Sequence, residues 1–130
     1  MYEFESKSAS KTVLKRVVFS EYQANVFNLA LLDVLPDGET SDISESKNND
    51  IRIILATVIR IISDFFNQNP NVIITFRGND HRRQRLYRLV IGRELSVIEA
   101  KFRIFGLIDG VIERFEPDKH YEVFIIQKLS

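Results

Sequence analysis

The sequence predicts an α+β fold in which five to seven strands, mostly antiparallel, form a sheet covered by two helices. Three observations predict this fold. Residues 49–67 have a strongly amphipathic helix pattern, strand-like stretches stand on both sides of it, and Asp109-Gly110 marks a hairpin near the C-terminus. A length of 130 residues is usual for one domain, so we expect residues 1–130 to fold as a unit.

The N-terminal third is expected to supply up to three strands. Residues 1–10 are polar and are predicted to be a flexible or edge segment. Partial alternation predicts a strand at 12–20, and the apolar run at 25–34 predicts a second, more buried strand. The sequence PDG at 36–38 signals a turn, because proline presets φ and glycine tolerates positive φ, and a short exposed strand is expected after it.

The helix at residues 49–67 follows from the spacing of its apolar residues, which recur on one face at 3.6 residues per turn. These residues are Ile51, Ile54, Leu55, Val58, Ile61, Ile62 and Phe65. Ile53, Ile59 and Phe66 widen the stripe, so we expect the helix to be buried on more than one side. The sequence NQNPN at 67–71 ends it.

The C-terminal half is predicted to complete the sheet around a second helix. NVIITF at 71–76 has the composition of a strand, and KFRIFGLI and VIERF form a hairpin about Asp109-Gly110. HYEVFIIQKL at 120–129 is expected to be the closing strand. The second helix is predicted at about 80–91, packed on the sheet beside the long helix.

The most unusual stretch is RGNDHRRQRLYRLVIGR at residues 77–93, which holds six of the eleven arginines and one acid, Asp80. It carries a formal charge of +5 in a chain whose net charge is zero. A solvent-exposed helix face normally mixes charges of both signs, because oppositely charged neighbours three or four residues apart attract. We therefore expect negative charges from outside this segment to balance its arginines.

Two conformations of this segment stay open. In the helix, Asn79 caps the N-terminus and Gly92 closes the C-terminus. Leu86, Leu89 and Val90 then form a narrow apolar face, His81, Arg85 and Arg88 lie opposite, and Arg82 and Arg83 lie nearer the apolar side. In the alternative, the segment is a strand with Arg83, Arg85, Tyr87, Leu89 and Ile91 on one face.

The leading functional hypothesis is a non-enzymatic binding domain that contacts nucleic acid or another polyanion, with single-stranded nucleic acid or RNA favoured. Guanidinium groups hold phosphate oxygens bidentately, and a tyrosine ring can stack on a base. The residues expected to contact the ligand are Arg77, Arg82, Arg83, Arg85, Tyr87, Arg88 and Arg93.

The first alternative is a protein-interaction module. The arginines can pair with the acidic stretch 33–50, which has a net charge of −5, either within one chain or across a homodimer. One half of a bacterial toxin–antitoxin-like pair is a version of the same hypothesis, in which a partner protein supplies the acids. The acidic residues concerned are Asp33, Asp37, Glu39, Asp42, Glu45 and Asp50.

The second alternative is a small ribonuclease that uses His81 and His120, the only two histidines, for general acid–base catalysis. Nothing in the sequence brings these residues together, so we expect no enzyme activity and assign no catalytic residue. No spacing of His, Asp or Glu resembles a metal site, and no glycine-rich phosphate-binding motif is present. The sequence predicts no metal and no cofactor.

Three stretches, ILATVIRIISDFFNQNPNV, RQRLYRLVIGREL and FGLIDGVIERFEPDKHYEVFII, resemble a family of short bacterial domains of unknown function, common in Bacteroidetes. The resemblance spans nearly the whole chain and implies a bacterial origin and a cytoplasmic location, but no activity. Members of the family often open the second helix with a proline, whereas this chain has GNDHRR. The absence of cysteine fits a reducing compartment, and no apolar run is long enough to predict a membrane span.

Overall fold

The computed structural model describes residues 2–7, 12–34, 40–42, 48–78 and 80–129, and it confirms the predicted α+β class. Its elements alternate as the sequence predicts, with strands on both sides of a long helix. In chain order they are β1 (Tyr2–Lys7), β2 (Thr12–Gln23), β3 (Val26–Val34), β4 (Thr40–Asp42), α1 (Asn48–Gln68), β5 (Ile73–Phe76), α2 (His81–Arg93), α3 (Leu95–Glu99), β6 (Phe102–Ile108), β7 (Val111–Arg114) and β8 (Val123–Lys128).

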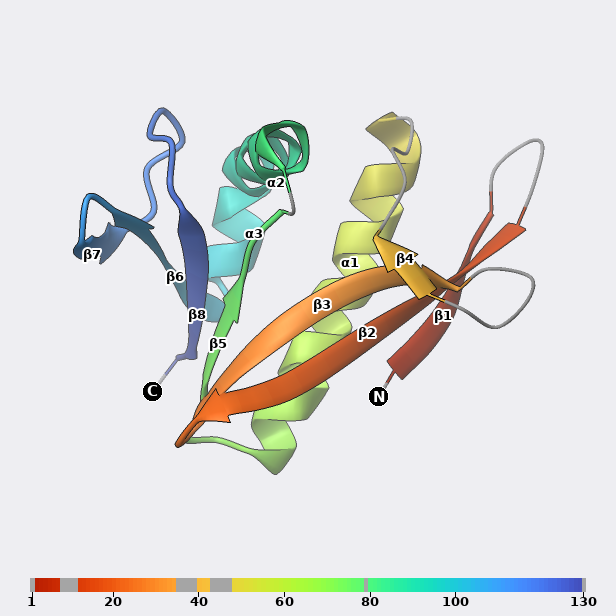
Figure 1. Ribbon diagram of the computed structural model, residues 1–130, viewed down its shortest axis with the longest axis horizontal. Helices are drawn as coiled ribbons and strands as arrows, with labels where there is room; N and C mark the ends of the chain where they lie inside the picture. Colours follow the sequence, from red (N-terminus) through yellow and green to blue (C-terminus); the bar gives the residue numbers. More distant parts are fainter. Residues whose placement is uncertain (1, 8–11, 35–39, 43–47, 79, 130) are drawn as a thin grey trace.

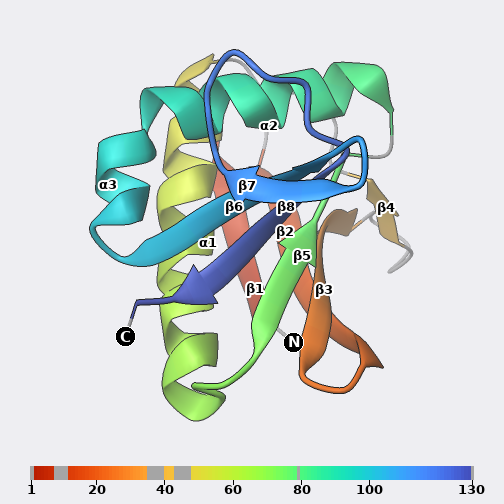
Figure 2. The same cartoon turned by 90° about the vertical axis from the view of Figure 1, so that its left-hand side faces the viewer.

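One twisted sheet runs through the molecule in the order β1-β2-β3-β5-β8-β6-β7, with the short β4 paired to β3 (Figure 1). All described pairings are antiparallel except that of β3 with β5. The chain passes through α1 between these two parallel strands, as a crossover requires. Figure 2 shows α2 crossing one end of the sheet and α3 turning down at the far end of α2.

The core lies between the sheet and the helices, and alternate residues of the central strands point into it. Ile74, Phe124 and Ile104 come from β5, β8 and β6, and each is at most 1% exposed. Lys15 of β2 is 2% exposed and lies two positions before Val17, which belongs to the same core. The helices therefore cover one face of the sheet.

Helix α1 confirms the predicted stripe from Ile54 to Phe65, with one correction; the side chain of Ile51 lies outside the described residues. Phe66 is 1% exposed, and the ring of Phe65 stacks on that of Phe19 with 3.9 Å between centroids. Ile53, expected to widen the apolar stripe, is instead 65% exposed. It lies on the side of the helix that faces away from the sheet, so its apolar character has no packing role in the described part of the fold.

The parallel pairing of β3 with β5 is short, and the two strands then diverge (Figure 1). Val26, Phe27 and Asn28 pair with β5, whereas β4 pairs with the other end of β3, at residues 32–34. Between these two ladders, residues 29–31 pair only with β2 among the described strands. The sheet therefore has a fork at this point, and the fork positions the candidate site.

Local signals specify the hairpin of β6 and β7. Asp109 and Gly110 both have positive φ, 51° and 76°, as a tight turn of this type requires. The five-residue α3, by contrast, has no counterpart among the predicted elements. Strand β1 lies at the edge of the sheet, within the segment predicted to be flexible or an edge. None of the helices in the described ranges has the length and apolar character needed to cross a membrane.

Candidate functional site

The arginine-rich segment folds as helix α2, which rules out the strand alternative. The observed N-cap is Asp80; the predicted cap, Asn79, lies outside the described residues. The Asp80 carboxylate accepts the backbone N–H of Arg83 at 2.8 Å and pairs with its guanidinium at 3.2 Å. A carboxylate at this position also offsets the unfavourable interaction of the first-turn cations with the helix dipole.

The C-terminal end of α2 differs from the prediction. Gly92 does not end the helix, which continues to Arg93 and is capped by Glu94. A Cβ atom at Gly92 would lie 3.3 Å from Cβ of Pro117, so glycine at this position lets the loop before β8 approach closely. Arg88 donates from Nη1 to the carbonyl oxygen of Pro117 at 3.1 Å and ties the helix to the same loop.

The outward side of α2 carries what we call the outer stripe: Arg82, Arg85, Leu89 and Arg93, all exposed. These residues follow one another by three or four positions, so they form one row along the helix. Arg82 was expected nearer the apolar side; because α2 rests on the sheet through Val90 and Ile91, Arg82 faces outward instead. Arg88 is half-buried against Pro117 and does not belong to the row.

The inward side of α2 borders a pocket of about 630 Å³, which we call the fork pocket because residues of both diverging strands, β3 and β5, line it. Its floor is apolar and includes buried residues of α1, α3 and β6, such as Ile54, Ile98 and Ile104. Its polar rim consists of Tyr22, Asn28, Thr75, Arg77, Arg83 and Tyr87. The rim residues are exposed or half-buried, so they mark the mouth.

The rim is held by a few contacts of its own. The Tyr22 hydroxyl and Thr75 Oγ1 are 3.1 Å apart and join β2 to β5 across the end of β3. Tyr87 packs edge to face on Phe76, with 6.1 Å between ring centroids. Among the described residues that line the pocket, none is acidic, and Arg77 and Arg83 are the charged ones. The described rim therefore offers guanidinium groups beside an apolar floor.

The segment that joins β5 to α2 is positioned by Gln84. Its side chain accepts the backbone N–H of Gly78 at 2.6 Å and donates to the carbonyl oxygen of Tyr121 at 2.8 Å. A Cβ atom at Gly78 would meet backbone atoms of Arg83 and Gln84 at 2.5–2.7 Å, so glycine is required for the chain to turn this tightly. These contacts place Arg77 at the rim.

The two histidines lie on different elements, both exposed. His81 is the first residue of α2, and His120 precedes Tyr121 in the loop between β7 and β8. No hydrogen bond orients either imidazole among the contacts of the described residues. Within those same residues, no group of three or more His, Asp or Glu side chains is placed to hold a metal ion.

The pairing of the arginines with the acidic stretch 33–50 stays a prediction, because the side chains of that stretch lie outside the described residues. Within the described part of the chain, the carboxylate found on the arginine-rich segment is its own Asp80. Arg77, Arg85 and Arg93 form no ion pair with any described residue.

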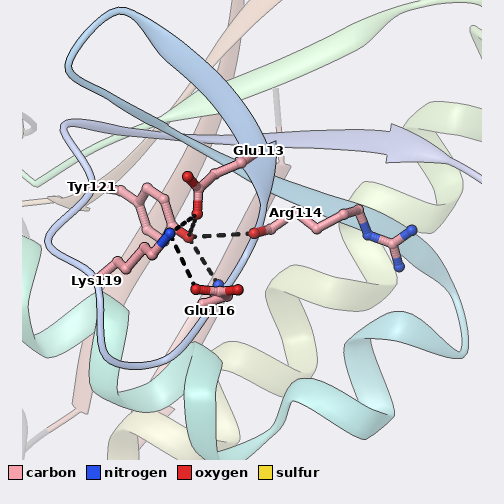
Figure 3. Close-up of polar contacts among 5 residues, drawn as sticks. All are labelled: Glu113, Arg114, Glu116, Lys119 and Tyr121. Carbon is pink, nitrogen blue, oxygen red and sulfur yellow. Dashed lines mark hydrogen bonds and ion pairs between the residues drawn. The ribbon is translucent and has the colours of Figure 1, made fainter.

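A second group of polar residues, the β7–β8 cluster, was not singled out from the sequence (Figure 3). Tyr121 is 3% exposed; its hydroxyl donates to Glu113 at 2.9 Å and accepts the backbone N–H of Glu116 at 3.0 Å. Lys119 Nζ lies 2.8 Å from Glu113 and 3.2 Å from Glu116. The ring of Tyr121 covers Gly106, where a Cβ atom would overlap it.

These contacts shift the ionisation of all three groups in the direction that preserves them. Hydrogen bonds from Lys119 and Tyr121 lower the pKa of Glu113, and the two carboxylates raise the pKa of Lys119. Burial, followed by the hydrogen bond to Glu113, raises the pKa of Tyr121. Since each group is held in its ordinary protonation state at neutral pH, the β7–β8 cluster is suited to fastening the loop, not to proton transfer.

Sequence reasoning identified Arg77, Arg83 and Tyr87 but missed the fork pocket that they border. Tyr22, Asn28 and Thr75 come from two strands before α1 and one after it, and nothing local to these residues indicates that they meet. The signal that would have found them is the parallel pairing of β3 and β5, which follows from the helix between two apolar strands.

The comparisons with known proteins assign no activity to the chain. No curated protein and no solved structure matches the chain. A family model described as a family of unknown function, DUF6934, matches residues 1–129, which is nearly the whole chain. The chain therefore belongs to DUF6934, a family of unknown function.

Proposed function

We propose that this protein is a non-enzymatic binding domain whose outer stripe contacts a polyanion, and that the ligand is single-stranded nucleic acid, RNA in particular. One observation carries the proposal: Arg85 and Arg93 are exposed in one row with Arg82 and form no ion pair with any described residue. Phosphate oxygens are the usual partners of guanidinium groups that the fold leaves exposed in a row.

The spacing within the stripe supports a flexible, extended ligand. Arg85 and Arg93 are eight residues apart, which is about 12 Å along a helix at 1.5 Å per residue. Leu89 lies between them and offers an apolar contact to a base. A single strand can adjust its phosphates to such a row and turn its bases toward the surface between them.

The structure narrows the residues that we assign to this contact. Arg88 donates to Pro117, and Tyr87 faces Phe76 and the fork pocket, so neither lies on the outer stripe. Arg77 and Arg83 border the fork pocket. The proposed polyanion contact therefore consists of Arg82, Arg85 and Arg93. We place the domain in the bacterial cytoplasm, where its lack of cysteine is suited to a reducing environment.

The test is the binding of fluorescein-labelled oligouridylate, followed by anisotropy over a series of salt concentrations. Three phosphate contacts predict that log Kobs falls with log salt at a slope of about −2, since each contact on a single strand contributes about −0.7. The Arg85→Gln/Arg93→Gln variant should bind at least about tenfold more weakly and show a flatter slope.

A matched control removes two exposed arginines elsewhere, Arg60 on α1 and Arg103 on β6. Arg60→Gln/Arg103→Gln changes the net charge equally and should leave binding within about twofold of wild type, because it spares the outer stripe. Absence of any anisotropy change at low salt would overturn the proposal. An equal loss in both variants would also overturn it, since it would reduce the effect to overall charge.

Two other outcomes would favour the competing hypotheses. A salt-sensitive dimer in light scattering, disrupted by Arg85→Gln/Arg93→Gln, would point to the interaction module, in which acids of a second chain meet the stripe. Cleavage of the oligouridylate that disappears in His81→Ala/His120→Ala would point to the ribonuclease. We expect no cleavage, because His81 lies on α2 and His120 on a separate loop.

A further inference from the structure

The fork pocket has the size and location of a ligand-binding pocket. Its volume of about 630 Å³ lies within the roughly 300–1,000 Å³ range of small-molecule sites. It lies between the helices and part of the sheet. In most proteins this space is filled by close-packed side chains. A hollow of this size at the centre of a small fold sacrifices packing contacts, so a bound molecule would restore what the side chains do not supply.

The floor of the pocket determines what can lie in it. Residues from α1, α2, α3 and β6 line it with aliphatic and aromatic side chains, and no described floor residue is charged. A polar molecule would lose its hydration there without gaining hydrogen bonds, which is unfavourable. The part of the ligand that occupies the floor is therefore hydrocarbon.

The rim determines what the exposed end of the ligand carries. Arg77 and Arg83 are the charged residues among the described lining, and a guanidinium fork matches a carboxylate. Arg83 also pairs with Asp80, whereas Arg77 is exposed and forms no ion pair with any described residue. Arg77 is therefore the rim residue best placed to hold the charged end of the ligand.

The course of the pocket determines the shape of the ligand. Arg83 lies in the first turn of α2, whereas Ile98 belongs to α3 at the far end of that helix (Figure 2). Residues 83 and 93 alone are about 15 Å apart along the helix axis at 1.5 Å per residue. The pocket thus runs lengthwise beneath α2, with its polar rim at one end and its apolar floor at the other.

We propose that the fork pocket binds a long-chain carboxylate, with the acyl chain on the apolar floor and the carboxylate beside Arg77 and Arg83. This binding site is separate from the outer stripe, which lies on the opposite side of α2. The two proposals succeed or fail independently, because Arg85 and Arg93 do not line the pocket.

The test uses the full chain and palmitate below its critical micelle concentration, with displacement of a fluorescent long-chain carboxylate as the readout. Two further ligands keep the chain and change the head group: the alcohol and the amine. Palmitate should bind at least about tenfold more tightly than either, since a charge-assisted contact is lost in the alcohol and replaced by repulsion in the amine.

Two variants locate the ligand. Arg77→Gln should weaken palmitate binding about tenfold and leave binding of the alcohol unchanged, because it removes the head-group contact only. Val58→Phe adds a ring to the floor and should abolish the binding of both ligands. Arg85→Gln is the matched control: it removes an arginine of the outer stripe, and palmitate binding should stay as in wild type.

Arg77 is exposed, so its replacement preserves the fold and keeps the test decisive even if Val58→Phe proves unstable. The proposal is overturned if wild type takes up no palmitate, or if palmitate and the alcohol bind equally. It is also overturned if Arg77→Gln and Arg85→Gln weaken palmitate to the same extent, since binding would then follow overall charge and not the rim.

Discussion

The β7–β8 cluster and the fork pocket both bring aromatic and charged side chains together, and they differ in how the charges are balanced. In the β7–β8 cluster, Lys119 contacts two carboxylates and the phenol of Tyr121 donates to one of them. At the pocket rim, Arg77 has no carboxylate among the described residues, and Arg83 has Asp80. Among the described residues, the charges of the cluster are paired with one another, whereas Arg77 at the rim has no paired acid.

The packing of the two regions differs in the same way. The ring of Tyr121 lies against Gly106 so closely that no Cβ atom fits there. The fork pocket, which β6 and β8 also help to line, leaves about 630 Å³ between the same sheet and the helices. The closed packing of the cluster suits a stabilising role, and the open volume of the fork pocket is what the ligand-binding proposal rests on.

The largest effect is expected from Gly106→Ala, which adds a methyl group where the Tyr121 ring already lies. In an open strand position this change stabilises by roughly 0.5–1 kcal/mol, because glycine is the more flexible residue when unfolded. Here it should reduce the free energy of unfolding by about 3 kcal/mol, as overpacking does. Urea unfolding followed by circular dichroism measures the loss.

Removing the ring tests the cause. In a Tyr121→Ala background, Gly106→Ala should cost less than about 0.5 kcal/mol, so the two substitutions are strongly coupled. An equal cost in both backgrounds would show that the strand, and not the ring, excludes a side chain at this position.

Tyr121→Phe should have an intermediate effect. It removes the hydroxyl that donates to Glu113 and accepts the Glu116 N–H, while the ring stays in place. The Glu116 N–H then loses its acceptor. A part-buried donor without an acceptor costs about 1–3 kcal/mol, so we expect the free energy of unfolding to fall by about 2 kcal/mol in the same assay. A loss below about 0.5 kcal/mol would mean that water replaces the hydroxyl and that the cluster is not closed.

The effect of Tyr121→Phe should also depend on pH. Burial and Glu113 raise the pKa of Tyr121 above its ordinary value of 10.0, so the folded chain holds the phenolic proton more tightly than the unfolded chain. The stabilisation is complete below pH 10 and is lost as pH rises through the raised pKa. The difference between wild type and Tyr121→Phe should therefore narrow above pH 10. The pKa of Tyr2 is also raised, to about 12, so Tyr2 adds a loss of stability over the same pH range. The comparison should therefore be made between two chains that both carry Tyr2→Phe, one with Tyr121 and one with Tyr121→Phe.

The elements that local signals specify could be predicted, and the contacts between distant segments could not. The apolar spacing within α1 and the turn at Asp109-Gly110 are properties of neighbouring residues, and both are confirmed. The fork pocket requires β5 to pair with the start of β3 and β4 with its end. Strand order of this kind depends on the whole chain and has no local signal.

The arginine-rich segment has some features that local signals predicted and others that depend on distant segments. Its helical conformation follows from periodicity. The predicted apolar face of Leu86, Leu89 and Val90 is wrong at Leu89, which is 39% exposed, because the helix rests on the sheet through Val90 and Ile91. The division of its arginines does not follow from periodicity either. Arg83 turns toward the fork pocket and Arg88 toward Pro117 because of where β3 and the loop before β8 happen to lie. Charge counting predicted one basic surface, and the fold separates it into an outer stripe and a pocket rim.

The smallest effect is expected at the fork pocket, where the same kind of change should have the opposite sign. Val58 lies on the floor of the fork pocket and is 8% exposed, and Val58→Ile adds one methylene to a region with room for it. Burying a methylene contributes about 0.8 kcal/mol, so the variant should be more stable than wild type by about 0.5–1 kcal/mol. Val97→Ile on α3 is the matched control, because Val97 is 49% exposed and the added methylene stays in water; its effect should be near zero. If Val58→Ile instead lowers the free energy of unfolding by about 1 kcal/mol or more, the floor of the pocket is as closely packed as the surroundings of Gly106. The contrast between a closed cluster and an open pocket would then no longer hold.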